Sequence, residues 1–186
     1  KITLPSNYFM KGNSNTDIYS FEFNLSEDYL EKFSQTCLEY DLAEGTLLSI
    51  LWYYLLSEIA PDQTIEGLVC LGTDELLRTI SIEVDKCSYI HQLISLAKES
   101  FEISNEIPVE SLIFYNKGLD EQISCLFTKD KPRMPNFDIQ VNIQKQENQI
   151  NILFDLNSKL DKNMMLEVLQ NYNRVIQAFC EQAVRV

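Results

Sequence analysis

Residues 45–59 read GTLLSILWYYLLSEI, and this stretch decides how the rest of the chain is arranged. Its leucines and isoleucines cover most of the circumference at 3.6 residues per turn. A helix that is apolar nearly all round must be buried on nearly all sides. The stretch is too short to cross a bilayer, which needs about 20 apolar residues. We therefore predict a central core helix with the other elements packed around it.

The bulk composition fits one ordinary domain or one lobe of a larger one. The 186 residues are 45% hydrophobic and include 10 Phe, 9 Tyr and 1 Trp, which is enough for a real core. The net charge of −13 disfavours nucleic acid and anionic membranes as partners, because both require a basic face. The charge is compatible with a basic or neutral partner. We find no signal peptide or transmembrane pattern, and the start at Lys1 suggests either a piece of a longer polypeptide or a processed chain.

The cysteines predict a reduced, cytosolic protein. Their number is odd, no two have the spacing of a CxxC motif, and most lie in apolar surroundings, where a free thiol behaves as a small hydrophobe. Asn24-Leu25-Ser26 matches the glycosylation pattern, which is common by chance. We expect neither a metal site nor a cofactor. The five cysteines are Cys37, Cys70, Cys87, Cys125 and Cys180.

Upstream of the central helix, residues 1–17 are polar and irregular and are predicted to be a linker, with residues 18–186 forming one lobe. Alternating apolar residues predict a strand at residues 19–25. Ser26 is expected to cap a helix that ends near Asp41 and buries a stripe of three residues. That stripe consists of Leu30, Phe33 and Cys37.

Downstream, Pro61 should stop the central helix, and two strands are expected at residues 64–71 and 78–84, joined by Gly72-Thr73-Asp74. Ser88 is expected to cap an amphipathic helix, and Pro108 to begin a short one. The apolar stripe of the first of these helices is Ile90, Leu93, Ile94, Ala97 and Phe101.

The C-terminal third should add strands and a last helix. Ile123, Cys125 and Phe127 suggest one strand, residues 137–143 and 150–156 a hairpin with a polar loop at 144–148, and residues 165–179 a helix. The element order β-α-α-β-β-α-α-β-β-β-α predicts an α/β or α+β two-layer sandwich, with helices packed on one mixed sheet.

Candidate catalytic residues are few. The single histidine, His91, is expected to be a partly exposed helical residue. Metal chemistry needs several converging ligands, and the sequence has no HExxH motif or Cys/His cluster. It also lacks the Gly-x-Ser-x-Gly turn of a serine nucleophile. Gly67 and Gly72 lack the Lys-Ser/Thr sequence that completes a phosphate-binding loop.

Two further polar or aromatic features have ordinary structural interpretations. The cluster Trp52-Tyr53-Tyr54 could line a ligand cleft, but inside a buried helix it is more often core. Asp138 interrupts the apolar residues of a predicted strand, and an inward carboxylate would need a partner because an unpaired buried charge is expensive. We expect Asp138 to point away from the core instead.

Motifs in the expected order make the chain resemble the C-terminal lobe of nonribosomal peptide synthetase condensation domains, which belong to the chloramphenicol-acetyltransferase-like superfamily. The resemblance begins at Leu4-Pro5, and residues 45–59 look like the family's T-hydrophobic-hydrophobic-x-A helix. Residues 107–112 are close to P-F-E-x-L-V, and residues 137–141 are similar to F-D-L-x-L. The resemblance covers nearly the whole chain and implies a chloramphenicol-acetyltransferase-like half-domain.

The departures from this family bear on function. A complete condensation domain resembles two such lobes, with a His-His-x-x-x-Asp-Gly motif tied to amide or ester formation between carrier-bound acyl groups. This sequence has one histidine, so no catalytic position carries over. Only Gly72–Leu77 stands where the family has a longer segment that reaches toward the partner lobe. Arg78 could be a remnant of a family arginine and is assigned no function.

The resemblance therefore implies a non-catalytic lobe, a structural platform between domains of a cytoplasmic peptide synthetase or hybrid synthase. Expected partners are the adjacent adenylation domain and the carrier protein. The alternative is the C-terminal half of an active condensation domain, with the His-His lobe supplied elsewhere. A stand-alone acyl-carrier or small-molecule binding module is a third possibility without a specific motif. An exposed lobe face also predicts self-association.

Overall fold

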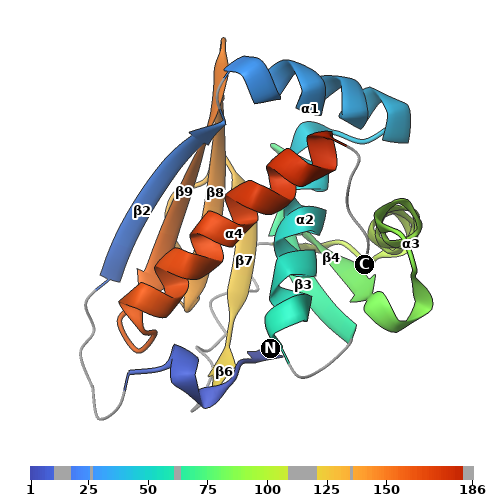
Figure 1. The fold of residues 1–186 in the computed structure, drawn as a ribbon. Helices are drawn as coiled ribbons and strands as arrows, with labels where there is room; N and C mark the ends of the chain where they lie inside the picture. Colours follow the sequence, from blue (N-terminus) through green and yellow to red (C-terminus); the bar gives the residue numbers. More distant parts are fainter. Residues whose placement is uncertain (11–17, 26, 61–63, 109–120, 135, 182–186) are drawn as a thin grey trace.

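The helices pack against one face of a sheet (Figure 1). This computed structural model describes residues 1–10, 18–25, 27–60, 64–108, 121–134 and 136–181. The main sheet has seven strands, in the order β2 (Ile18–Leu25), β9 (Gln149–Asn157), β8 (Ile139–Gln146), β7 (Cys125–Lys129), β3 (Thr64–Cys70), β4 (Leu76–Glu83) and β5 (Ile107–Pro108). The helices are α1 (Glu27–Tyr40), α2 (Glu44–Ile59), α3 (Ile90–Ile103) and α4 (Lys162–Cys180).

The sheet is mixed, as predicted. β7 pairs in parallel with both β3 and β8, whereas the other neighbouring pairs are antiparallel. With the helices on one face, this confirms the predicted two-layer α/β fold.

The helix predicted to be the core, α2, lies at the centre of the structure. Every residue from Gly45 to Ser57 is buried, because β3 and β4 lie on one side of α2 and α4 on the other. The Trp52 ring contacts the rings of Phe154 and Tyr172, with centroids 5.5 and 5.2 Å apart. The Tyr172 hydroxyl donates a hydrogen bond of 2.7 Å to the carbonyl of Leu48, so its polar end is satisfied inside the core.

The N-terminal predictions hold where the structure describes them. β2 and α1 form as expected, and Asp41 ends α1 with a positive φ of 53°. Ser26 and Pro61 lie outside the described residues. Within the predicted linker, residues 1–10 contact the rest of the chain: β1 (Ile2–Thr3) pairs with β6 (Gln122–Ile123) in a separate two-stranded sheet. The domain boundary at residue 18 remains a prediction.

The hairpin predicted at residues 137–156 is present, but its turn is tighter than expected. β8 and β9 pair in continuous register to Gln146 and Gln149, so only Glu147 and Asn148 form the turn. The five-residue loop predicted at 144–148 is therefore wrong. Its first three residues extend β8, because polar side chains at the solvent end of a strand do not interrupt the backbone ladder. β3 and β4 form a second hairpin.

Three other predictions need correction. Pro108 does not begin a helix; it lies in β5 and pairs with Leu76 at the edge of the sheet, where its missing N–H costs no ladder bond. Residues 109–120 lie outside the described residues. The N-cap of α3 is Tyr89 rather than Ser88, because the Gln92 side chain accepts from both backbone N–H groups. Residues 122–129 form two strands, β6 and β7, instead of one.

Candidate functional site

Asp138, expected to face away from the core, is fully buried. The expectation failed because β8 is covered on both faces. Ile139 and Val141 face the helix layer, while Gln140 and Asn142 face a connection that folds back over the other side of the sheet. A strand covered on both faces has no solvent side on which a charge could lie.

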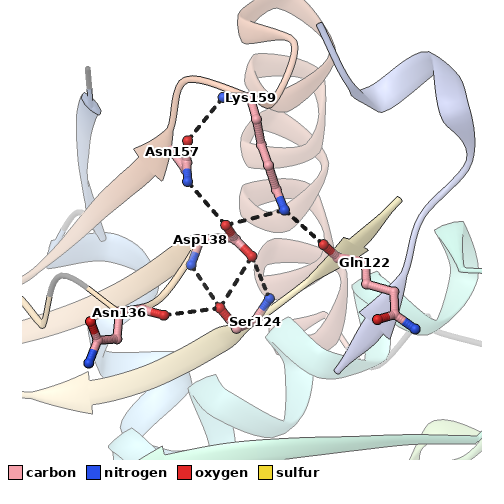
Figure 2. Close-up of polar contacts among 6 residues, drawn as sticks. All are labelled: Gln122, Ser124, Asn136, Asp138, Asn157 and Lys159. Carbon is pink, nitrogen blue, oxygen red and sulfur yellow. Dashed lines mark hydrogen bonds and ion pairs between the residues drawn. The ribbon is translucent and has the colours of Figure 1, made fainter. Parts of the chain in front are cut away.

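The Asp138 carboxylate is held by a compact polar network (Figure 2). Its Oδ2 accepts from the Ser124 backbone N–H at 2.9 Å and lies 3.2 Å from the Ser124 hydroxyl. Its Oδ1 accepts from the Asn157 side-chain amide at 3.1 Å and lies 3.4 Å from Lys159 Nζ. Both oxygens are therefore engaged by protein groups.

This network joins elements that are distant in the sequence. Ser124 stands immediately before β7, Asp138 immediately before β8, and Asn157 at the end of β9. Lys159 leads toward α4, and its ammonium also donates to the Gln122 carbonyl of β6 at 2.9 Å. The arrangement clamps these strand ends together and places no free carboxylate oxygen where a substrate could be met.

A second polar group fixes the connection between β7 and β8. The Gln140 side chain donates to the Pro132 carbonyl and accepts from the Met134 N–H. The Asn142 side chain accepts from the Lys131 N–H at 3.1 Å and from the Thr128 hydroxyl at 2.8 Å. Sequence reasoning missed this group. The sequence feature that could have revealed it is the polar residue at every second position of an otherwise apolar strand.

His91 and the aromatic cluster agree with the interpretations made from sequence. His91 is exposed on α3 and stacks on Tyr89, with centroids 5.7 Å apart. Trp52, Tyr53 and Tyr54 are buried in α2, so they belong to the core. The Tyr53 hydroxyl donates to the Leu68 carbonyl at 2.7 Å, which fixes α2 against β3.

The buried thiols are poor nucleophiles. Burial, the largest cause, raises the pKa of Cys37 and of Cys125 to about 12 and that of Cys180 to about 11. At neutral pH these groups are protonated, whereas the thiolate is the reactive form. Among the described residues, no cluster of three or more His, Cys, Asp or Glu side chains could hold a metal ion.

A hollow of about 420 Å³ opens where α1 meets the start of α2. Its lining includes Cys37, Glu44, Lys129 and Lys145. Glu44 Oε1 accepts from the Ser34 hydroxyl and from Lys145 Nζ, both at 3.1 Å. These contacts join α1, α2 and the end of β8. Glu44 Oε1 and Lys145 therefore act as a structural tie between these elements.

Apolar side chains are exposed along α3. Leu96 and Ile103 lie seven residues apart and so share one side of the helix; Tyr89, the N-cap, precedes them, and Ile107 follows on β5. In chain order, from Tyr89 to Ile107, their exposed fractions are 46%, 37%, 76% and 40%. We call these four residues the α3 row. Nearby, Arg78 pairs with Glu106 and lies over the Phe101 ring, so it ties β4 to the segment around α3.

No protein-family model and no curated protein matches the sequence. Solved structures do match. The cyclization–docking bidomain of the nonribosomal peptide synthetase EpoB from Sorangium cellulosum superposes with a TM-score of 0.73 at 9% identity, covering 97% of this chain and 45% of that one. The X-domain in its complex with OxyB from teicoplanin biosynthesis gives 0.75 at 10%, covering 100% and 50%. The SgcC5 protein from Streptomyces globisporus gives 0.73 at 10%, covering 100% and 53%.

This chain therefore spans about half the length of the solved structures that it matches. At these identities the similarity shows the fold, and it confirms the predicted chloramphenicol-acetyltransferase-like half-domain. Of the helices in the described part of the chain, none combines the length and the apolar character that a membrane crossing requires.

Proposed function

We propose that this chain is a non-catalytic, condensation-like lobe that serves as a platform between domains of a nonribosomal peptide synthetase or hybrid synthase. One observation carries the proposal. The fold of half a condensation-type domain occurs here in 186 residues that contain a single histidine, exposed on α3, instead of a His-His pair. We therefore infer that the role of this lobe is structural.

The chemistry of the interior supports this proposal. The Asp138 carboxylate is held by protein groups on both oxygens, and the buried thiols are protonated at neutral pH. All five cysteines are unpaired, which supports placement of the parent synthetase in the reducing cytoplasm.

The surface supports a role in domain contacts. The α3 row exposes apolar side chains of the kind that an interface covers. The X-domain, which shares this fold, was solved in complex with OxyB, so one protein of this fold has a protein partner. For this chain we propose the adjacent adenylation domain as the main partner and the carrier protein as a second.

Calorimetric titration of the purified chain with the adjacent adenylation domain tests the proposal. We expect binding that weakens at least tenfold when both Leu96 and Ile103 are replaced by Glu. The matched control Glu102→Gln, on the same helix, should bind as the unaltered chain does. Deletion of the lobe from the parent protein should lower solubility, adenylation or product formation; unchanged values for all three would contradict the proposal.

The alternative is the C-terminal half of an active condensation domain. It is favoured by the coverage of about half of the EpoB, X-domain and SgcC5 structures. The short connection between β3 and β4, residues 71–75, argues against it, because the family's longer segment reaches toward the partner lobe. Mixing this chain with a separate lobe that carries the His-His motif, together with donor and acceptor thioesters, decides the matter. Amide or ester formation that needs both lobes would establish the alternative.

A further inference from the structure

The two ends of the main sheet differ in how they meet solvent. At one end lies β5, which has two residues and contains Pro108, a residue typical of protected sheet edges. At the other end lies β2, whose eight residues all pair with β9 on one side only among the described strands. The outer side of β2 therefore presents a long row of backbone N–H and C=O groups.

Apart from the single charge of Glu22, β2 lacks the features that usually block such an edge. Its sequence, IYSFEFNL, contains no proline, lysine or arginine, and its pairing with β9 runs in one unbroken register without a bulge. Tyr19, Phe21 and Phe23 point toward the helix layer and remain partly exposed. The edge is regular enough to accept another strand.

A hollow of about 240 Å³ lies beside this edge, between β2 and α4. Phe21, Phe23 and Phe154 line it from the sheet, and Leu166 and Leu169 from α4. Its polar lining consists of Glu22, Gln170 and Asn173. At about 30 Å³ per water molecule, the space equals roughly eight waters, which suits one large apolar side chain.

An open strand beside a helix-lined hollow is the geometry of strand addition. In that mode, main-chain hydrogen bonds to the edge provide affinity, and a pocket for alternate side chains provides specificity. We propose that the groove between β2 and α4 binds an extended, basic peptide segment of a partner protein, with one apolar side chain seated in the hollow.

Charge favours a basic peptide over a second copy of this chain. Each chain carries a net charge of −13, so pairing two copies edge to edge opposes two strongly acidic proteins. Glu167 is exposed on α4 beside Leu166, and Glu22 is exposed on β2, on the opposite face of the strand from Phe21 and Phe23. Lys162, at the start of α4, is already placed over the Tyr19 ring at 5.6 Å. The inference concerns an edge remote in sequence from the α3 row and does not depend on the proposed function.

Fluorescence anisotropy with labelled octapeptides tests this inference on the full chain. The probe alternates lysine or threonine with valine and has one central phenylalanine. One comparison peptide replaces each lysine by glutamate, and a second replaces two residues by proline to remove N–H donors. We expect the basic peptide to bind at least tenfold more tightly than either comparison peptide. Equal affinity for all three would overturn the proposal.

Variants of the chain test whether the basic peptide binds in the groove between β2 and α4. Leu166→Trp should fill the hollow and weaken binding of the basic peptide at least tenfold, while the matched control Leu38→Trp, at an exposed position on α1, should not. If circular dichroism shows that Leu166→Trp fails to fold, the exposed change Glu22→Lys replaces it and should reduce the preference for the basic over the acidic peptide.

Hydrogen exchange gives an independent readout. Amides of β2 should exchange more slowly in the presence of the basic peptide, and protection confined to other elements would overturn the proposal. A salt-resistant dimer that is lost in Glu22→Pro would show that a second copy occupies the edge instead, and would likewise overturn it.

Discussion

Asp138 is a carboxylate without solvent contact, and its neighbours explain how the fold tolerates it. Burial of an unpaired charge costs several kcal/mol, which good geometry and additional hydrogen bonds can offset. Here the Ser124 N–H, the Asn157 amide and the Lys159 ammonium surround the two oxygens. The side chain of Lys159 is 22% exposed, so the cation itself remains partly hydrated.

Asp138→Asn should lower the free energy of unfolding by about 3 kcal/mol, because it leaves the partly buried Lys159 ammonium without its counter-charge and turns an amide toward the donors around Asp138. The matched control is Asp155→Asn. Asp155 accepts one exposed hydrogen bond, from the Ser20 hydroxyl, so its loss should cost less than about 1 kcal/mol. Urea unfolding measures both. Equal losses for the two variants would refute a special role for Asp138.

The buried thiol of Cys125 leads to a second prediction, on how the free energy of unfolding depends on pH. Burial raises its pKa from the ordinary 9.0 to about 12, so the unfolded chain releases this proton first as pH rises. The resulting contribution to stability is complete below pH 9 and is lost as pH rises toward 12. Urea unfolding between pH 8 and pH 11 should therefore show a falling free energy, and Cys125→Ala should flatten the fall. The slope should be unaltered in His91→Gln.

Among the elements, the contact between α2 and β3 depends on one glycine. The Tyr53 ring lies directly on Gly67, so a methyl group at that position would overlap the ring carbons. The Tyr53 hydroxyl is fixed at the same time by the Leu68 carbonyl. Close approach of a core aromatic to the strand is therefore possible only where the strand has no side chain.

Gly67→Ala should destabilise the fold by about 3 kcal/mol, since a ring held at both ends cannot move aside. Glu66→Ala, at the neighbouring exposed position, should change stability by less than about 0.5 kcal/mol. In a Tyr53→Ala background the cost of Gly67→Ala should fall below about 1 kcal/mol. A cost that is the same in both backgrounds would show that the ring is not its cause.

The elements also show what sequence could predict. The all-round apolar pattern of α2 predicted its burial because no other environment suits such a helix. The alternation of β8 and β9 predicted the hairpin for a similar reason. The pattern did not reveal Asp138, Gln140 and Asn142 as buried, because alternation looks the same whether the polar side meets water or a connection of the same chain. Pro108 was misassigned because proline suits both a helix start and a sheet edge.

For the whole molecule, net charge and exposed apolar surface have opposite effects on self-association. The charge of −13 repels a second chain, while the α3 row offers area that association would cover. Salt shortens the range of the repulsion to about 3 Å at 1 M and leaves the apolar attraction in place. The self-association expected from sequence should therefore appear as salt rises.

Sedimentation equilibrium should give an average mass above that of the monomer at 1 M NaCl and closer to it at 20 mM. Ile103→Glu, at the most exposed position of the row, should restore the monomer mass at high salt. Glu99→Gln on the same helix is the control and should not. A monomer under every condition would remove the self-association prediction.

The pairing of β2 with β9 has a consequence for biosynthesis. Ser20 and Asp155 meet in this pair, although 135 residues separate them. During translation at ~5–20 residues per second, β2 would remain without its partner strand for many seconds, until β9 leaves the ribosome. Such distant pairings also close slowly. Nascent chains that stall before residue 150 should consequently remain protease-sensitive and depend on chaperones, and the lobe should form only after most of its own length has been made.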